Sequence, residues 1–245
     1  MGRNKNIDMT AFEHLAELRV RLAISAACLF LAAIGSFTYV DSIRSILVGA
    51  LGDYSLIYLT PPEAFIANLR LAFLSGFIIS LPLILYQISA YVFPGLNRGE
   101  KIFYICVLLG AIILFSAGVT FAYFVVFPIA IRFFLQFASA QLVPQFTVSE
   151  YISFFISFHL AFGIVFQLPL MTWSLGKIGL LTSDFLKKYR KIALLIMLIM
   201  SAIITPPDVV SQMFLVLPLL LLYELGVVLV IVSEKKREKR FSEQE

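Results

Sequence analysis

The sequence predicts an all-α membrane protein that crosses the bilayer six times, and three observations support this. First, 60% of the 245 residues are hydrophobic and only 14% are charged, with a mean hydropathy of +0.95, whereas about a quarter of the residues in soluble domains are charged. Second, four long stretches contain no charged residue, and each could cross a hydrocarbon core of about 30 Å as a helix. These stretches are 22–40, 71–97, 102–131 and 151–176. Third, the basic residues gather in alternate connecting segments.

We expect one membrane domain, 1–245, that begins with a cytoplasmic amphipathic segment at 1–19 and ends with a tail at 233–245. The expected spans are about 20–40, 68–93, 102–127, 152–175, 191–204 and 209–232. No small-residue cleavage site follows a short apolar core near the start, so the first span should be retained.

The last two spans are less regular than the others. The apolar run 192–204 would be only about 20 Å long as a helix, and 209–233 contains Pro218 and Glu224. One interpretation is a re-entrant hairpin, and the other is a pair of short spans in a thinned bilayer. An outer tip at 205–210 without Lys or Arg favours two crossings.

The basic residues predict the orientation. Segments 1–21, 94–101, 176–191 and 233–245 hold four, two, five and five of them, which is 16 of the 19 in the chain. Because Lys and Arg near span ends collect on the cytoplasmic side, both termini should lie in the cytoplasm, as in a multi-pass protein of the inner (cytoplasmic) membrane. The net charge of +4 then reflects topology, and we expect no nucleic-acid partner.

Prolines inside the spans predict bends. Pro82 and Pro169 each remove a backbone hydrogen bond from an apolar helix. Together with the undersized fifth span, they favour a concave cup over a straight bundle.

Polar residues at membrane depth are candidate functional groups, because an unpaired polar group there is costly. Gln87, Gln167 and Glu224 are the main candidates for polar groups facing a membrane groove. Each also has a plain alternative: Gln87 could be an interfacial amide, Gln167 could bond a carbonyl freed by Pro169, and Glu224 could reach the interface. His159 is more simply explained as a hydrogen-bond partner of a neighbouring helix than as a catalyst.

The sequence contains few residue patterns that are typical of catalytic sites. The pair Ser157 and His159 points to different faces of a helix, and the chain has neither a zinc-protease motif nor a phosphate-binding Gly-Lys-Ser/Thr motif. Cys28 and Cys106 lie in apolar runs and indicate neither a disulfide framework nor a metal site. We therefore expect no enzyme, no cofactor and no metal.

Several motifs occur in an order that resembles one membrane-protein family. They are His14-Leu-Ala-Glu-Leu-Arg-Val-Arg-Leu22, Thr60-Pro-Pro-Glu-Ala-Phe65, Leu81-Pro-Leu-Ile-Leu-Tyr-Gln87, Phe121-Ala-Tyr-Phe-Val-Val-Phe-Pro128, Ala161-Phe-Gly163, Thr205-Pro-Pro-Asp-Val-Val-Ser-Gln212 and Leu222-Tyr-Glu-Leu-Gly226. Together they cover the whole chain and resemble the TatC family of twin-arginine translocation proteins.

The resemblance implies a six-helix receptor that binds the twin-arginine signal peptides of folded proteins. It also implies partnership with the single-span proteins TatA and TatB and transport driven by the protonmotive force, and it leaves self-association open. Glu17 and Glu100 match the acids of the family's twin-arginine site, which displaces the simpler interpretation of both as surface ion pairs. Arg19, Tyr91 and Lys101 match positions at the same surface.

Other positions are assigned by the same resemblance. Gln167 stands where the family usually has a glutamate. We expect TatB to contact the short fifth span at Ala202, Ile203 and Ile204, because an undersized helix leaves an exposed flank. Residues with structural roles in the outer loops are Phe65, Pro206, Pro207 and Asp208.

The expected mechanism has two steps. The arginine pair docks on Glu17 and Glu100, and the apolar part of the signal peptide then enters a membrane groove near Gln87 and Gln167. The alternatives are a Sec-type membrane insertase, which would disregard an arginine pair, and a secondary transporter, which would need a midplane site and usually internal repeats.

Overall fold

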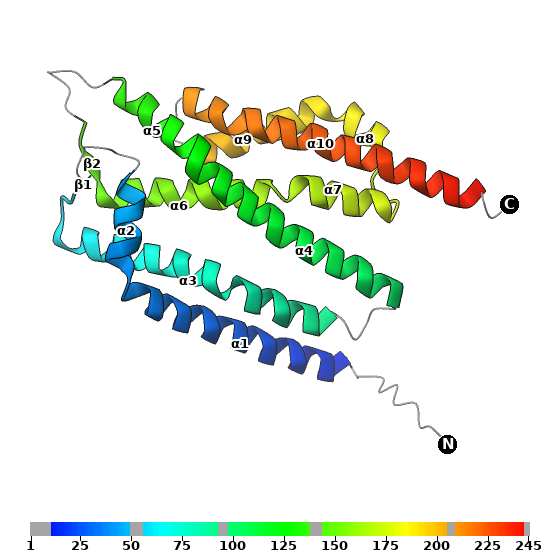
Figure 1. The fold of residues 1–245 in the computed structure, drawn as a ribbon, viewed down its shortest axis with the longest axis horizontal. Coiled ribbons are helices and arrows are strands. Elements are labelled where there is room, and N and C mark those ends of the chain that lie inside the picture. Colours follow the sequence, from blue (N-terminus) through cyan, green and yellow to red (C-terminus); the bar gives the residue numbers. More distant parts are fainter. Residues whose placement is uncertain (1–10, 50–55, 93–97, 138–143, 205–208, 243–245) are drawn as a thin grey trace. The chain divides into compact units, whose positions relative to one another are not determined.

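The computed structural model describes residues 11–49, 56–92, 98–137, 144–204 and 209–242, and nearly all of them are helical (Figure 1). The described residues form two compact units. The first unit draws on Met1–Ile46 and Phe65–Phe103, and the second on Leu47–Ala64 and Tyr104–Glu245.

The first unit is built on two long helices. These are α1 (Ala11–Phe37) and α3 (Pro61–Val92), joined through α2 (Val40–Val48) and followed by the first turns of α4 (Arg98–Phe121). α1 and α3 lie side by side (Figure 1), and they approach closely at Gly76. A Cβ added to Gly76 would lie only 2.5 Å from the backbone nitrogen of Ala33. Small residues at helix contacts are the usual basis of close packing in membranes.

The second unit contains the rest of the helices and a short parallel pair of strands. In chain order its elements after α4 are the π-helix η3 (Ala122–Val126), α5 (Phe127–Leu135), α6 (Val148–Val165), α7 (Leu168–Lys177), α8 (Ser183–Lys188), α9 (Arg190–Ile204) and α10 (Val209–Ser242). The strands are β1 (Leu56–Ile57) and β2 (Phe146–Thr147), with Leu56 opposite Phe146.

Five helical stretches of the described chain are long and apolar enough to cross a membrane. They are Leu15–Phe37, Pro61–Tyr91, Gly99–Leu135, Val148–Lys177 and Gln212–Lys236. α9 has 15 residues, which is about 22 Å of helix and shorter than a typical span. The all-α polytopic class predicted from the sequence is confirmed.

The prolines at positions 82, 128 and 169 affect their helices differently. Pro82 lies within the continuous helix α3. Before Pro169 the chain leaves the α-helix at Phe166 and Gln167, as the predicted bend requires. Before Pro128 the chain forms the π-helix η3, where the amide of Phe127 donates to the carbonyl of Ala122. A proline lacks the amide that would continue the ladder, so the bonds upstream shift to a wider turn.

The second unit is held by aromatic and close helix packing. Phe127 is buried against the rings of Tyr151, Phe154 and Phe155 at centroid distances of 5.2 to 5.7 Å. Near the β1–β2 pair, the hydroxyl of Tyr151 donates to the carbonyl of Leu47 at 2.7 Å. These contacts tie the segments that precede and follow α4 into one unit.

The α1–α3 contact generates the first prediction. Replacing Gly76 by alanine places a methyl group against the backbone of α1, so the helices must separate, at a cost of about 1 to 3 kcal/mol for overpacking. We expect a lower midpoint of thermal unfolding in detergent.

The matched control is Gly35→Ala in α1, where an added Cβ meets nothing within 4 Å. This variant should unfold at or above the midpoint of the unmodified protein, because alanine favours a helix over glycine. Equal midpoints for the two variants would contradict the close α1–α3 contact.

Candidate functional site

The residues predicted to recognise a ligand come from three helices of the first unit. The N-terminal part of α1, the end of α3 and the start of α4 lie at the same end of this unit (Figure 1). α1 supplies Glu17 and Arg19, α3 supplies Gln87 and Tyr91, and the first turn of α4 supplies Glu100. Glu17 and Glu100 are 83 positions apart in the sequence, and the helix pairing brings their helix ends to the same end of the unit.

Arg21 joins α1 to α3 at this end. Its Nε donates to Oε1 of Glu17 at 3.0 Å, its Nη2 forms a further short contact with the same oxygen, and its Nη1 donates to Oε1 of Gln87 at 3.3 Å. The side chains of Arg21 and Glu17 are only 23% and 21% exposed. The pair is therefore better shielded from water than an ordinary surface ion pair.

The second carboxylate oxygen of Glu17 is the exception in this network. Oε2 is buried and has no hydrogen-bond partner among the described residues. A buried acceptor without a donor costs roughly 1 to 3 kcal/mol, and more when it is charged. The arrangement thus holds one oxygen of Glu17 with Arg21, while the other is buried without a donor among the described residues.

The remaining predicted residues of this end differ in exposure. Arg19 and Glu100 are exposed, and Lys101 and Tyr91 are half-buried. Gly99 is also exposed, and a Cβ added there would meet nothing within 4 Å. The first turn of α4 therefore offers an accessible acid with open space beside it.

Gln167 belongs to the second unit and is engaged within it. Its Nε2 donates to the carbonyls of Gly163 and Ala111, both at 3.2 Å. Gly163 lies just before the helix break, and Ala111 belongs to α4. One side chain thus satisfies a carbonyl at the break, as the simpler interpretation expected, and also joins α4 to α6.

Glu224 lies on α10 and pairs with Arg190, whose Nη2 lies 2.7 Å from Oε2 of Glu224. Both side chains are about half exposed, at 48% and 49%. Arg190 is the first residue of α9, so this ion pair links the start of α9 to the middle of α10. The only acid predicted inside a span is therefore accompanied by a positive charge.

The end of α9 presents apolar side chains. Ala202 is exposed and Ile203 is 74% exposed, whereas their neighbour Ser201 is fully buried. The side chain of Ile204, together with Pro206, Pro207 and Asp208, lies outside the described residues. Phe65, which was predicted to support an outer loop, packs edge-on against Phe37 in the first unit at 6.1 Å.

His159 is buried in α6. Its Nδ1 bonds the carbonyl of Phe155 at 2.8 Å, and its ring stacks on the Phe155 ring at 3.7 Å. The described residues contain no group of three or more His, Cys, Asp or Glu side chains arranged to hold a metal ion. The expected hydrogen bond to a neighbouring helix is therefore wrong: among the described contacts, His159 bonds a carbonyl of its own helix, and its ring packs near Tyr123 and Phe127 at 6.1 and 5.4 Å.

The contacts of two residues, Arg21 and Glu63, were not predicted from the sequence. In the sequence, Arg21 is only one member of the motif His14–Leu22, and its bond to Gln87 depends on a residue 66 positions away. Glu63 was noted only within a motif, yet its carboxylate accepts from the amides of Leu59 at 2.8 Å and Ser149 at 3.2 Å. The consecutive prolines before Glu63 were a usable signal, because an acid in the first turn of a helix commonly bonds nearby amides.

Nearly the whole chain is similar to known proteins of one family. The family model described as "Sec-independent protein translocase protein (TatC)" matches residues 13–218. A TatC protein of Carboxydothermus hydrogenoformans is 41% identical over 238 residues, which is 96% of each chain. A TatC protein of Aquifex aeolicus is 37% identical over 237 residues, covering 94% of this chain and 98% of that protein.

A solved structure is also similar. The crystal structure of a twin-arginine translocase receptor, TatC, superposes with a TM-score of 0.78 at 37% identity, covering 90% of this chain and 99% of that chain. The same receptor in dodecyl maltoside gives a TM-score of 0.77. With matches in sequence and fold over most of its length, the chain belongs to the TatC family of Sec-independent protein translocases.

Proposed function

We propose that this chain is the receptor and core subunit of a twin-arginine translocase in the cytoplasmic membrane, with both termini in the cytoplasm. It binds the twin-arginine signal peptides of folded proteins and performs no catalytic step. The observation that carries the proposal is the buried Oε2 of Glu17, which has no donor among the described residues and lies beside a carboxylate oxygen already held by Arg21. The family membership supports the proposal.

The chemistry of this end favours arginine as the ligand. A guanidinium group is a planar fork that donates several parallel hydrogen bonds to carboxylates, and a lysine ammonium cannot reproduce that geometry. One guanidinium donates to Oε2 of Glu17, and the second docks on the exposed carboxylate of Glu100. Arg21 orients Glu17 through one hydrogen bond and contacts Gln87 through another.

Orientation and energy supply follow from the same proposal. The basic residues of segments 1–21 and 94–101 support a cytoplasmic location for the recognition end, where signal peptides would arrive. The family resemblance implies that transport draws on the protonmotive force, and the absence of a nucleotide-binding motif from the sequence is compatible with this. A Sec-type insertase would handle unfolded segments without regard to an arginine pair, and a test of arginine dependence separates the two.

The recognition site generates a prediction about export. The double variant Glu17→Ala and Glu100→Ala removes both carboxylates, and each charge-assisted hydrogen bond is worth about 1.5 to 3 kcal/mol. We expect export of a twin-arginine reporter to fall at least about tenfold, since a factor of ten corresponds to about 1.4 kcal/mol. The export rate in cells measures it, normalised to the amount of receptor in the membrane.

The control is Glu150→Ala, which removes an exposed acid from the first turn of α6. This variant should export the reporter at the normal rate. Normal export by the double variant would show that Glu17 and Glu100 are surface ion pairs and would favour the insertase.

Assembly with single-span partners is proposed at α9. This helix is short, and one side of it is apolar and exposed, including Leu195, Ile199 and Ile203. Gln212 of α10 holds α9 from another side, donating to the carbonyl of Leu198 at 2.8 Å. The exposed side at Ala202 and Ile203 therefore remains available to the span of a TatB protein, and TatA joins the same complex.

Disulfide cross-linking tests this contact. In a chain without Cys28 and Cys106, cysteine at Ala202 or Ile203 should cross-link to a cysteine in the TatB span. Ser201→Cys is the matched control, because its side chain is fully buried and nearly unchanged in size. A cross-link at Ser201 equal to that at Ile203, or none at Ala202 and Ile203, would contradict the assignment.

A further inference from the structure

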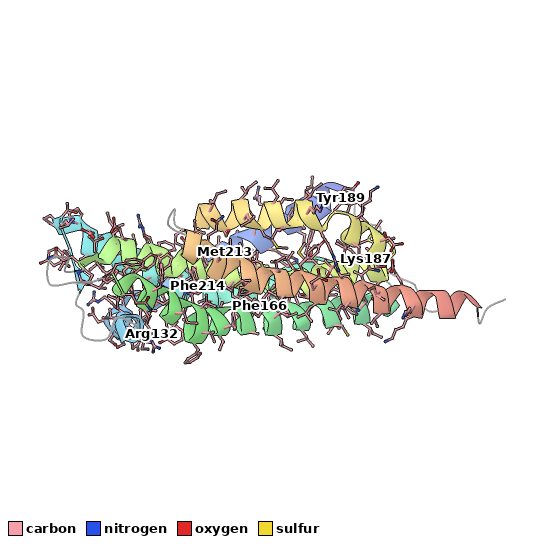
Figure 2. All side chains as sticks on the ribbon, turned by 90° about the horizontal axis from the view of Figure 1, so that it is seen from above. Arg132, Phe166, Lys187, Tyr189, Met213 and Phe214 are labelled. Carbon is pink, nitrogen blue, oxygen red and sulfur yellow. The ribbon has the colours of Figure 1, made fainter. Side chains whose placement is uncertain are left out.

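The connection between α7 and α9 is ordered and carries the short helix α8. α7 ends in a turn at Gly179, whose φ of 82° is the left-handed conformation that glycine adopts easily. The hydroxyl of Thr182 then accepts from the amide of Phe185 and begins α8. In Figure 2, Lys187 and Tyr189 mark this connection, and Arg132 lies toward the opposite end of the second unit.

Three polar contacts fix the connection to α10. The amide of Ser183 donates to Oε1 of Glu234 at 2.9 Å. The hydroxyl of Tyr223 donates to the carbonyl of Leu186 at 2.7 Å. Arg190, directly after the connection, pairs with Glu224. Because Ser183 and Leu186 are buried by these contacts, the opposite side of α8 is held outward in a defined orientation.

That outward side combines positive charge with apolar groups. The segment 177–191 contains five basic residues and one acid, Asp184. Lys187, Lys188 and Lys191 are exposed, and Lys187 lies 3.9 Å from Asp184. Between these charges the apolar side chains are unusually open: Leu180 is 76% exposed, and Phe185 is 52% exposed.

Aromatic rings accompany the lysines. Nζ of Lys177 lies 5.0 Å from the Trp173 ring, and Nζ of Lys188 lies 5.7 Å from the Tyr189 ring. The Tyr189 ring also packs on Phe185 at 4.6 Å. Trp and Tyr collect at membrane–water interfaces, where one side of the ring meets acyl chains and the other meets water.

We propose that the α8 surface, formed by Leu180, Phe185, Lys187, Lys188 and Lys191, binds an anionic phospholipid of the cytoplasmic leaflet. The phosphate contacts Lys187 and Lys188, while Phe185 and Leu180 enter the upper acyl region. The location of this surface rests on the proposed orientation, in which the connection between α7 and α9 is cytoplasmic. The site is distinct from the recognition residues, all of which belong to the first unit.

Two features favour a lipid over a soluble acidic protein. The connection joins two membrane helices, α7 and α9, so its apolar side chains begin within reach of the bilayer. The cytoplasmic leaflet is negatively charged and attracts basic segments next to a span. The contacts to α10 hold the lysines in place, so binding requires little further ordering of the loop.

The test measures lipid retention by the full chain. The purified protein is placed in lipid discs of phosphatidylcholine containing phosphatidylglycerol, and the lipids that remain bound after transfer to detergent are counted by native mass spectrometry. Phosphatidylglycerol should be enriched over its share of the disc. In Lys187→Gln plus Lys188→Gln, the enrichment should fall by about fivefold for each lysine replaced.

Two controls make the test decisive. Lys187→Arg plus Lys188→Arg should restore the enrichment, because charge is kept. Arg70→Gln plus Arg132→Gln removes two exposed charges elsewhere and should leave the enrichment unchanged. Equal retention of the two lipids, or an unchanged enrichment in the glutamine variant at Lys187 and Lys188, would overturn the proposal. Neither result would affect twin-arginine recognition, which is measured separately by reporter export.

Discussion

The absence of water from the hydrocarbon core constrains every polar group in this protein. Each such group needs a partner within the chain, because an unpaired one costs several kcal/mol. Gln167 donates to the carbonyl of Gly163 near a helix break and to the carbonyl of Ala111 in α4, and Glu224 is paired with Arg190. Thr172 donates to the carbonyl of Leu168 in its own helix. Among the described residues, four buried side-chain atoms have no partner: Oε2 of Glu17, Oγ of Ser36, Nε2 of His159 and Oγ of Ser174. Of these, only Oε2 of Glu17 belongs to a carboxylate, and we propose that a bound ligand supplies its donor.

Close contacts between helices position these polar side chains. Close approach at Gly76 sets α3 against α1, and the same pairing places Gln87 within reach of Arg21. In the second unit, a Cβ added to Gly226 would lie 2.6 Å from Oγ1 of Thr172, so α10 and α7 also pack closely. That contact supports the connection bearing α8, whose lysines are held outward by α10. The proposed signal-peptide recognition therefore depends on the close packing of α1 and α3 at Gly76. The proposed lipid contact depends on the close packing of α7 and α10 at Gly226.

Much of this could be predicted from the sequence, because hydropathy and charge act locally along the chain. The long apolar helices, the short α9 and the break before Pro169 all follow from residues within one helix. The missed features depend on distant partners. The π-helix before Pro128, the β1–β2 pair and the bond between Glu63 and Ser149 each require knowing which segments meet. For Glu17, the family resemblance indicated the residue, and only the fold showed that one oxygen is held by Arg21 while the other is buried without a donor among the described residues.

Peptide binding to the detergent-purified chain tests the central claim most directly. A synthetic twin-arginine signal peptide and its Lys-Lys counterpart carry the same charge and differ only in the geometry of their donors. The account predicts that the arginine peptide binds at least about tenfold more tightly. It also predicts that Glu17→Ala and Glu100→Ala each reduce this preference. If both peptides bind equally well to the unmodified chain, Oε2 of Glu17 does not bind a guanidinium group. The assignment of Glu17 and Glu100 as the receptor site is then wrong.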